Sequence, residues 1–105
     1  MPPMLPGVTD VELEQRYLQT LAPGSRRAQT QAMQVLRYEL HPKTWRTLLR
    51  ADVLQVRETL AERYAPATAR RIMAALIGVL REAYLAGVYT IEQYTSLGWW
   101  SETDG

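Results

Sequence analysis

The chain has 105 residues, 47% of them hydrophobic and 22% charged, which is the length and composition of one soluble globular domain. It contains no cysteine, which excludes disulfides and thiolate metal sites, and its longest apolar run, Ile72 to Leu80, is about half as long as a membrane-spanning helix. The N-terminus has no basic start followed by an apolar segment, so we expect a cytoplasmic protein with no membrane role.

The net charge of +1 hides two strongly basic blocks. Residues 25–50 hold six arginines and lysines against one glutamate, and residues 63–81 hold four arginines and no acid. The compensating acids lie in residues 1–22, 51–62 and 82–105. Such blocks on an otherwise acidic chain favour a polyanionic partner on one side of the molecule, with solvated helix faces as the alternative.

The chain is predicted to begin with a flexible stretch, residues 1–8, which proline and glycine punctuate. Thr9 and Glu12 then have the spacing of a capping box, which predicts a first helix ending near Leu21. The side chains that this helix should bury are Leu13, Tyr17, Leu18 and Leu21.

The second predicted helix runs from Arg26 to Leu40, with Ser25 as its N-cap and Pro42 stopping it. Its buried residues should be Ala28, Ala32, Val35, Leu36 and Leu40, with Met33 at the margin. The opposite face has long hydrogen-bonding side chains and almost no acids, and it carries Arg26, Arg27, Gln29, Thr30, Gln31, Gln34 and Arg37.

A connector, residues 43–50, follows, in which Trp45 and either Leu48 or Leu49 should pack inward. A third helix is predicted from about Ala51 to Tyr64. Its apolar side chains at helical spacing are Leu49, Val53, Val56, Leu60 and Tyr64.

The fourth predicted helix, Pro66 to Ala86, organises the rest of the chain, and Gly87 should end it. Its buried stripe is Ile72, Leu76, Val79, Leu80 and Ala83. Its start offers Thr68, Arg70 and Arg71 at the positive end of the helix dipole. Three small residues, Ala74, Ala75 and Gly78, should let another helix approach closely.

A short fifth helix is predicted from Thr90, with Gln93 completing a capping box, to about Leu97. Tyr94 should pack in the core, while the roles of Trp99 and Trp100 stay open. No alternating strand pattern competes with these segments. We therefore predict an all-α fold, a compact bundle of four main helices and a short fifth one.

Catalytic signatures are missing from this sequence. The single histidine, His41, has no second imidazole for a metal site, and every glycine is isolated, so no phosphate loop is present. No serine has a base to activate it. We expect no enzyme activity, no metal and no cofactor.

Four motifs in order resemble the N-terminal core-binding (SAM-like) domain of the tyrosine recombinases, the phage-integrase family. They are Ser25–Arg27, Trp45–Leu48, Leu60–Ala69 and Ala74–Ala83, and Gly87 before a short last helix also fits. The likeness covers about Val8 to Leu97. Three positions depart from the usual pattern: Ala28 replaces a threonine, Arg70 an asparagine and Ile77 a basic residue.

The resemblance implies a core-binding domain over residues 9–97 and the start of a linker, residues 98–105, to an absent catalytic domain. Such a domain clamps duplex DNA for DNA integration and recombination and cleaves nothing alone. Its partners would be the recombination site, the C-terminal catalytic domain of the same protein and other recombinase protomers on the DNA. The family's second and fourth helices face the DNA, and these coincide with the two basic blocks.

The candidate DNA-binding residues have arginine, lysine, glutamine or hydroxyl side chains, which suit phosphates and base edges. They are Ser25, Arg26, Arg27, Thr30, Gln31, Gln34, Lys43, Arg46, Thr68, Arg70 and Arg71. Gln29 belongs to the same group of possible base readers. The alternative function is a helical protein–protein interaction module with no nucleic-acid role, which Ile77 and the two terminal tryptophans motivate.

Overall fold

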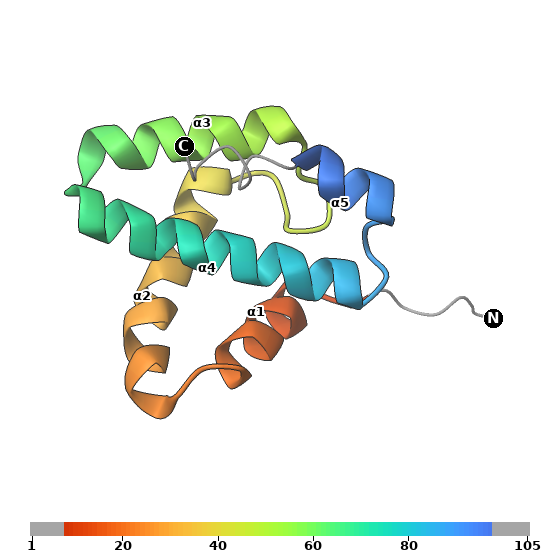
Figure 1. The fold of residues 1–105 in the computed structure, drawn as a ribbon, viewed down its shortest axis with the longest axis horizontal. Coiled ribbons are helices and arrows are strands. Elements are labelled where there is room, and N and C mark those ends of the chain that lie inside the picture. Colours follow the sequence, from red (N-terminus) through yellow and green to blue (C-terminus); the bar gives the residue numbers. More distant parts are fainter. Residues whose placement is uncertain (1–7, 98–105) are drawn as a thin grey trace.

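Five helices make up the fold in a computed structural model that describes residues 8–97 (Figure 1). They are α1 (Asp10–Gln19), α2 (Pro23–Leu40), α3 (Arg50–Arg63), α4 (Pro66–Leu85) and α5 (Ile91–Leu97). This part of the chain contains no strand. The prediction of an all-α bundle with four main helices and a short fifth is confirmed.

Some predictions concern residues outside the described range. These are the flexible stretch except Val8, the linker over residues 98–105, and the roles of Trp99 and Trp100. Val8, which was assigned to the flexible stretch, is instead partly buried against the core.

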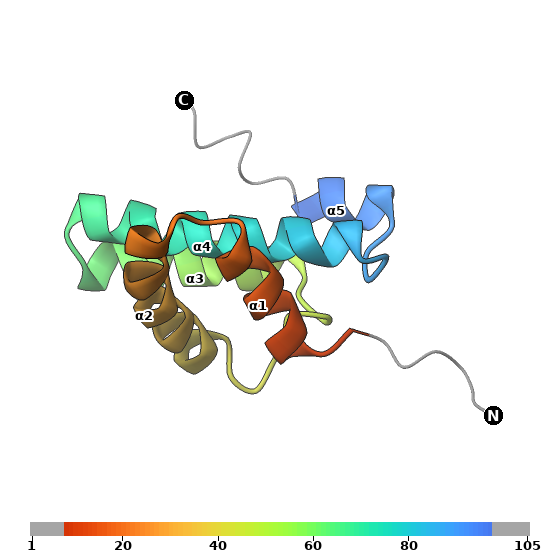
Figure 2. The ribbon, with the colours of Figure 1, turned by 90° about the horizontal axis from the view of Figure 1, so that it is seen from below.

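Helix α4 is central because it packs against each of the other four helices. It forms an antiparallel hairpin with α3, while α1 lies below it and α2 starts below it and crosses behind it (Figure 1). Seen from below, α1 and α2 project to the same side of α4 (Figure 2). This arrangement makes the predicted stripe of α4 the middle of the core.

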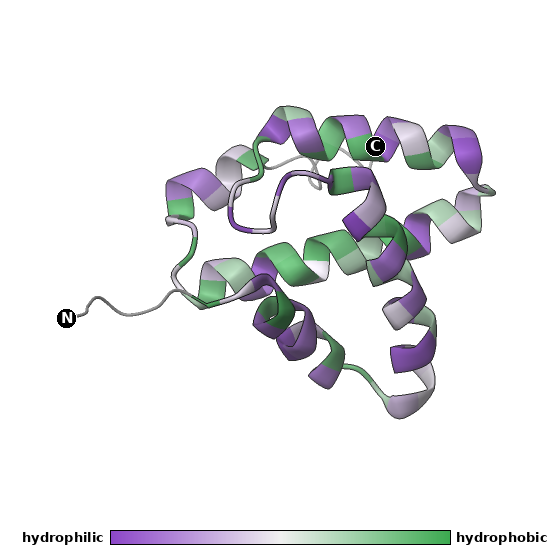
Figure 3. Cartoon of the chain, turned by 180° about the vertical axis from the view of Figure 1, so that it is seen from behind, coloured by the Kyte–Doolittle hydropathy of each residue, from purple (hydrophilic) through white to green (hydrophobic). Residues whose placement is uncertain are grey.

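The stripe of α4 is buried as expected, and apolar colour concentrates along this helix in Figure 3. Its buried residues are Ile72, Ala75, Leu76, Val79, Leu80 and Ala83. Gly78 accommodates α1, since a Cβ there would lie 2.0 Å from Cε1 of Tyr17. Gly78 therefore allows the close helix approach that the small residues predicted.

Local capping signals are correct at three helix ends. The Thr9 amide donates to Glu12 Oε1 at 3.0 Å and the Glu12 amide donates to Thr9 Oγ1 at 3.1 Å, so the capping box forms. These hydrogen bonds lower the pKa of Glu12. Thr90 and Gln93 form the same reciprocal pair at 2.8 and 3.0 Å. Gly87 adopts a φ of 85° just after α4, as a helix-ending glycine does.

The start of α2 differs from the prediction. The helix begins at Pro23 with Ala22 as N-cap, so Ser25 lies in the first turn, exposed, and caps nothing. Proline suits that position because its missing N–H would have no helical partner there. Met33 is fully in the core, whereas six residues that were predicted to pack inward are only partly buried: Leu18, Leu21, Ala28, Val35, Tyr64 and Tyr94.

The start of α3 also differs from the prediction, since the helix begins at Arg50. Its position determines which of the two connector leucines packs inward. Leu48 is 2% exposed and Leu49 is 62% exposed, so Leu48 packs inward beside Trp45. The prediction that Leu49 belongs to the buried stripe is wrong, because its backbone is extended (φ −114°, ψ 165°) as the N-cap of α3. Helices α1 and α4 end one or two residues earlier than predicted.

Candidate nucleic-acid interface

The beginnings of α2 and α4 are both basic. Arg26 and Arg27 follow the first turn of α2, and Arg70 and Arg71 follow that of α4. Neither first turn contains an acidic residue. Each helix also directs its unpaired N-terminal amides, the positive end of its dipole, at this region. Both starts therefore favour anions.

Helices α2 and α4 pack against each other, and one arginine of the α4 pair contacts α2 there. Arg71 Nη1 donates to the carbonyl of Ala28 at 2.9 Å, the residue directly after Arg27. Arg26 Nε donates to the carbonyl of Leu18 in α1 at 3.0 Å. Arg26 thus lies on the α1 flank of α2 and Arg71 on its α4 flank, so the two side chains bracket the first turns of α2.

Several candidate side chains at this crossing are free. Within residues 8–97, Arg27 and Arg70 have no hydrogen bond or ion pair, and the same holds for the exposed Gln31 and Gln34. The exposed Thr30 differs, because its hydroxyl donates to the carbonyl of Arg26 at 2.7 Å. Thr68, at the start of α4, is partly buried.

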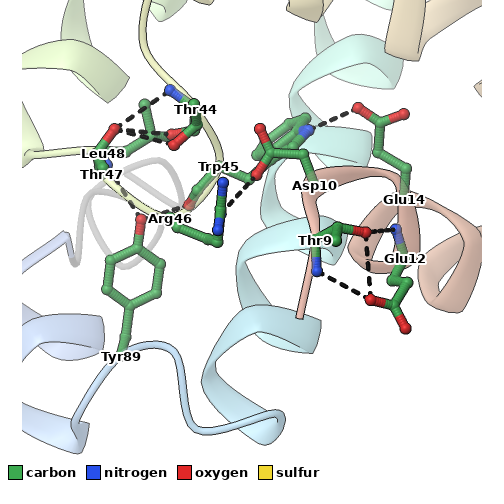
Figure 4. Close-up of polar contacts among 10 residues, drawn as sticks. All are labelled: Thr9, Asp10, Glu12, Glu14, Thr44, Trp45, Arg46, Thr47, Leu48 and Tyr89. Atoms are coloured by element: carbon green, nitrogen blue, oxygen red, sulfur yellow. Dashed lines mark hydrogen bonds and ion pairs between the residues drawn. The ribbon is translucent and has the colours of Figure 1, made fainter. Parts of the chain in front are cut away.

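Lys43 and Arg46 lie elsewhere. They follow the C-terminal end of α2, a helix of 18 residues and therefore about 27 Å long. Each is already in an ion pair. Lys43 Nζ pairs with Asp52 Oδ2 at 3.4 Å. Arg46 Nε pairs with Asp10 Oδ1 at 3.2 Å, as Figure 4 shows. The structure does not bring these two residues to the four arginines.

One residue that the sequence placed on the outer face of α2 points inward. Gln29 is 7% exposed, and its Nε2 donates to Tyr17 Oη at 2.9 Å and to the carbonyl of Arg71 at 3.3 Å. The prediction that Gln29 is an exposed base reader is therefore wrong. Its spacing from Met33 and Leu36, four and seven residues on, is the signal that could have located it in the core stripe.

Arg37 stays on the exposed face of α2, but it binds a carboxylate that the sequence did not single out. Glu14 of α1, 3% exposed, accepts hydrogen bonds from Arg37 Nε and Nη2 and from Trp45 Nε1, the last at 2.7 Å. The bonds to Glu14 raise the pKa of the Arg37 guanidinium. Glu14 stands between the core residues Leu13 and Tyr17, which is the signal for its burial.

Tyr89 continues this polar network from the loop after α4. Its hydroxyl donates to the carbonyl of Trp45 and accepts from the amide of Leu48 at 3.1 Å (Figure 4). Burial raises the pKa of Tyr89 above its ordinary value of 10.0. These bonds tie the connector to the loop that follows α4.

Other kinds of site find little support within residues 8–97. No three histidine, aspartate or glutamate side chains gather there as metal ligands would. None of the helices of this region has the length and apolar character needed to span a membrane. No family model, curated protein or solved structure matches the chain. The candidate site is therefore the group of arginine and glutamine side chains near the crossing of α2 and α4.

Proposed function

We propose that this chain binds duplex DNA as the core-binding domain of a site-specific tyrosine recombinase or integrase, and catalyses nothing by itself. One observation carries the proposal. Arg26, Arg27, Arg70 and Arg71 have no acidic partner among the described residues, whereas Arg37, Lys43 and Arg46 are each in an ion pair. Unpaired cations around one helix crossing are the charge arrangement that a phosphate backbone neutralises.

The side chains divide into two roles on this proposal. The four arginines hold phosphates, and the guanidinium of Arg71 has further N–H donors besides the one on Ala28. Gln31 and Gln34 extend from α2 with free amides, the groups that recognise adenine in a major groove. The resemblance supports the same two helices as the DNA-facing ones.

Titration of a random-sequence duplex at several salt concentrations tests the proposal. The logarithm of the affinity should fall with the logarithm of salt, with a slope of about −0.9 for each phosphate contact. Arg27→Ala and Arg70→Ala should each weaken binding and reduce that slope by about one contact. Lys43→Ala is the matched control, since it removes the same charge where Asp52 already neutralises it. Binding that is absent, or that does not depend on salt, contradicts the proposal.

A second candidate function is docking of another protein at the opposite end. Leu85 and Ile91 are more than half exposed, and so is Leu49, where α3 begins. These residues belong to α4, α5 and the start of α3, and α5 contacts both of the other helices. Ile77 supports this candidate less, because it is partly buried against the core.

Chemical shift mapping separates the two candidates. On addition of DNA, shifts confined to residues 25–34 and 67–71 support the DNA-binding function. Shifts that are absent from these residues and confined to α5 contradict the DNA-binding function and support protein docking.

A further inference from the structure

Gln29 is a buried polar residue of α2 whose side-chain amide is only partly hydrogen-bonded. Its side chain is more than nine-tenths buried, yet its Oε1 has no hydrogen-bond partner among the described residues. A buried amide with one unpaired oxygen costs stability relative to an apolar side chain of the same size. The residues around it in the stripe of α2 are apolar: Ala32, Met33, Leu36 and Leu40. A methionine or leucine would suit this position on packing grounds.

The contacts that Gln29 does make all concern the crossing of α2 with α4. Its Nε2 lies 3.3 Å from the carbonyl of Arg71, and Arg71 Nη1 lies 2.9 Å from the carbonyl of Ala28. Neighbouring residues of α2 are therefore bonded to a single residue of α4, once through its backbone and once through its side chain. These two bonds fix how far α4 can slide or turn against α2.

Helix α1 is joined to the same point. Tyr17 Oη accepts the second hydrogen bond from Gln29 Nε2 at 2.9 Å, and the Tyr17 ring lies against Gly78 of α4. Three helices thus meet at one side-chain amide, next to the arginines of the proposed interface. These hydrogen bonds add directional contacts to the register that apolar packing sets.

We propose that Gln29 is a positioning residue, which keeps α2 and α4 in the register that lets Arg71 reach a phosphate while Arg27 and Gln31 reach the same duplex. Gln29 touches no DNA itself. This inference rests on the DNA-binding function proposed above. It explains why a costly buried amide occupies a position where an apolar side chain would fit.

The test replaces both partners of the buried bond by apolar groups of similar shape, in Tyr17→Phe/Gln29→Met. Such a pair of changes can be neutral or stabilising, so the midpoint of urea unfolding should equal or exceed that of the wild type. DNA affinity should nevertheless fall about tenfold, the loss expected for one charge-assisted contact, with a salt slope smaller by about one phosphate contact. Gln29→Met alone is the second variant, and Gln55→Met, on the exposed face of α3, is the matched control.

A double-mutant cycle shows whether Gln29 acts through Arg71. In an Arg71→Ala background, Gln29→Met should have no further effect on DNA affinity. Equal losses with and without Arg71 overturn the inference, and so does a variant with wild-type affinity or one destabilised in proportion to its loss of binding. The wild-type titration keeps the two proposals apart: if the wild type binds no duplex, the proposed function fails, whereas failure of this inference leaves the wild-type affinity and its salt dependence intact.

Discussion

The two ends of α2 treat the same kind of side chain in opposite ways. At its C-terminal end and in the connector, Arg37, Lys43 and Arg46 are neutralised by carboxylates from α1 and α3. At its N-terminal end, Arg26 and Arg27 meet no acid, and the neighbouring start of α4 adds two more arginines. Two stretches of similar basic composition therefore differ in whether carboxylates neutralise their cations.

On the proposed function, this difference separates a stabilising region from a region that binds DNA. The connector end uses its charges and polar groups to hold α1, the connector and the loop after α4 together, through Glu14, Trp45 and Tyr89 (Figure 4). At the arginine end, Arg26, Arg27, Arg70 and Arg71 have no acidic partner among the described residues, and under the proposal a DNA backbone would neutralise them. The following predictions test whether stability and DNA binding depend on different ends of α2. They start with the largest expected effect.

Removing the carboxylate of Glu14 should give the largest loss of stability. Glu14→Ala leaves the buried Trp45 indole N–H without an acceptor and Arg37 without its partner, at a cost of about 3 kcal/mol in the free energy of unfolding. Glu14→Gln keeps an acceptor for the indole and should cost about 1 kcal/mol. Urea unfolding measures both. If the folded fraction of Glu14→Ala binds DNA less tightly than the wild type, the two ends are not separable.

Filling the contact between α1 and α4 should have the next largest effect. Gly78→Ala places a methyl group 2.0 Å from the Tyr17 ring, and the displacement should destabilise the fold by about 2 kcal/mol despite the better helix propensity of alanine. Gly24→Ala is the control, because nothing lies within 4 Å of its Cβ position. Equal unfolding midpoints for the two variants would show that Tyr17 moves aside at no cost.

Alkaline pH should weaken the connector end through Tyr89. Burial raises the pKa of its hydroxyl above 10.0 in the folded state, so the neutral phenol stabilises the fold fully below pH 10. That contribution is lost as the pH rises through the raised pKa. Unfolding midpoints of the wild type and Tyr89→Phe, measured across this range, should converge at high pH. A constant difference between them would contradict the assignment.

Removing single surface charges should change stability least, and the two ends should differ in the effect on DNA binding. Arg46→Ala breaks a half-exposed ion pair with Asp10 and should cost at most about 1 kcal/mol, without affecting DNA affinity. Arg27→Ala should leave stability within about 0.5 kcal/mol of the wild type. Only Arg27→Ala should weaken DNA binding. If Arg46→Ala weakens DNA binding and Arg27→Ala does not, the proposed difference between the two ends of α2 is wrong.

Much of the fold was predictable because it follows from short-range patterns. The capping boxes of Thr9 and Thr90 and the stop at Gly87 each depend on residues within a few positions of one another. For the candidate interface, the sequence predicted a list of residues but not which of them are free to bind a ligand. Sequence spacing listed Gln29 and Arg37 beside Arg27, although the first two are engaged by other helices.

The sequence by itself determined the helical class, the central stripe of α4 and the basic character of two segments, since these are properties of neighbouring residues. Only the tertiary structure decided which cations are neutralised and which amide is buried. Arg46 pairs with an aspartate 36 positions away, and Trp45 donates to a glutamate 31 positions away. Charge pairing and loss of solvent depend on distance through space, and residues so far apart in sequence are brought together only by the packing of whole helices.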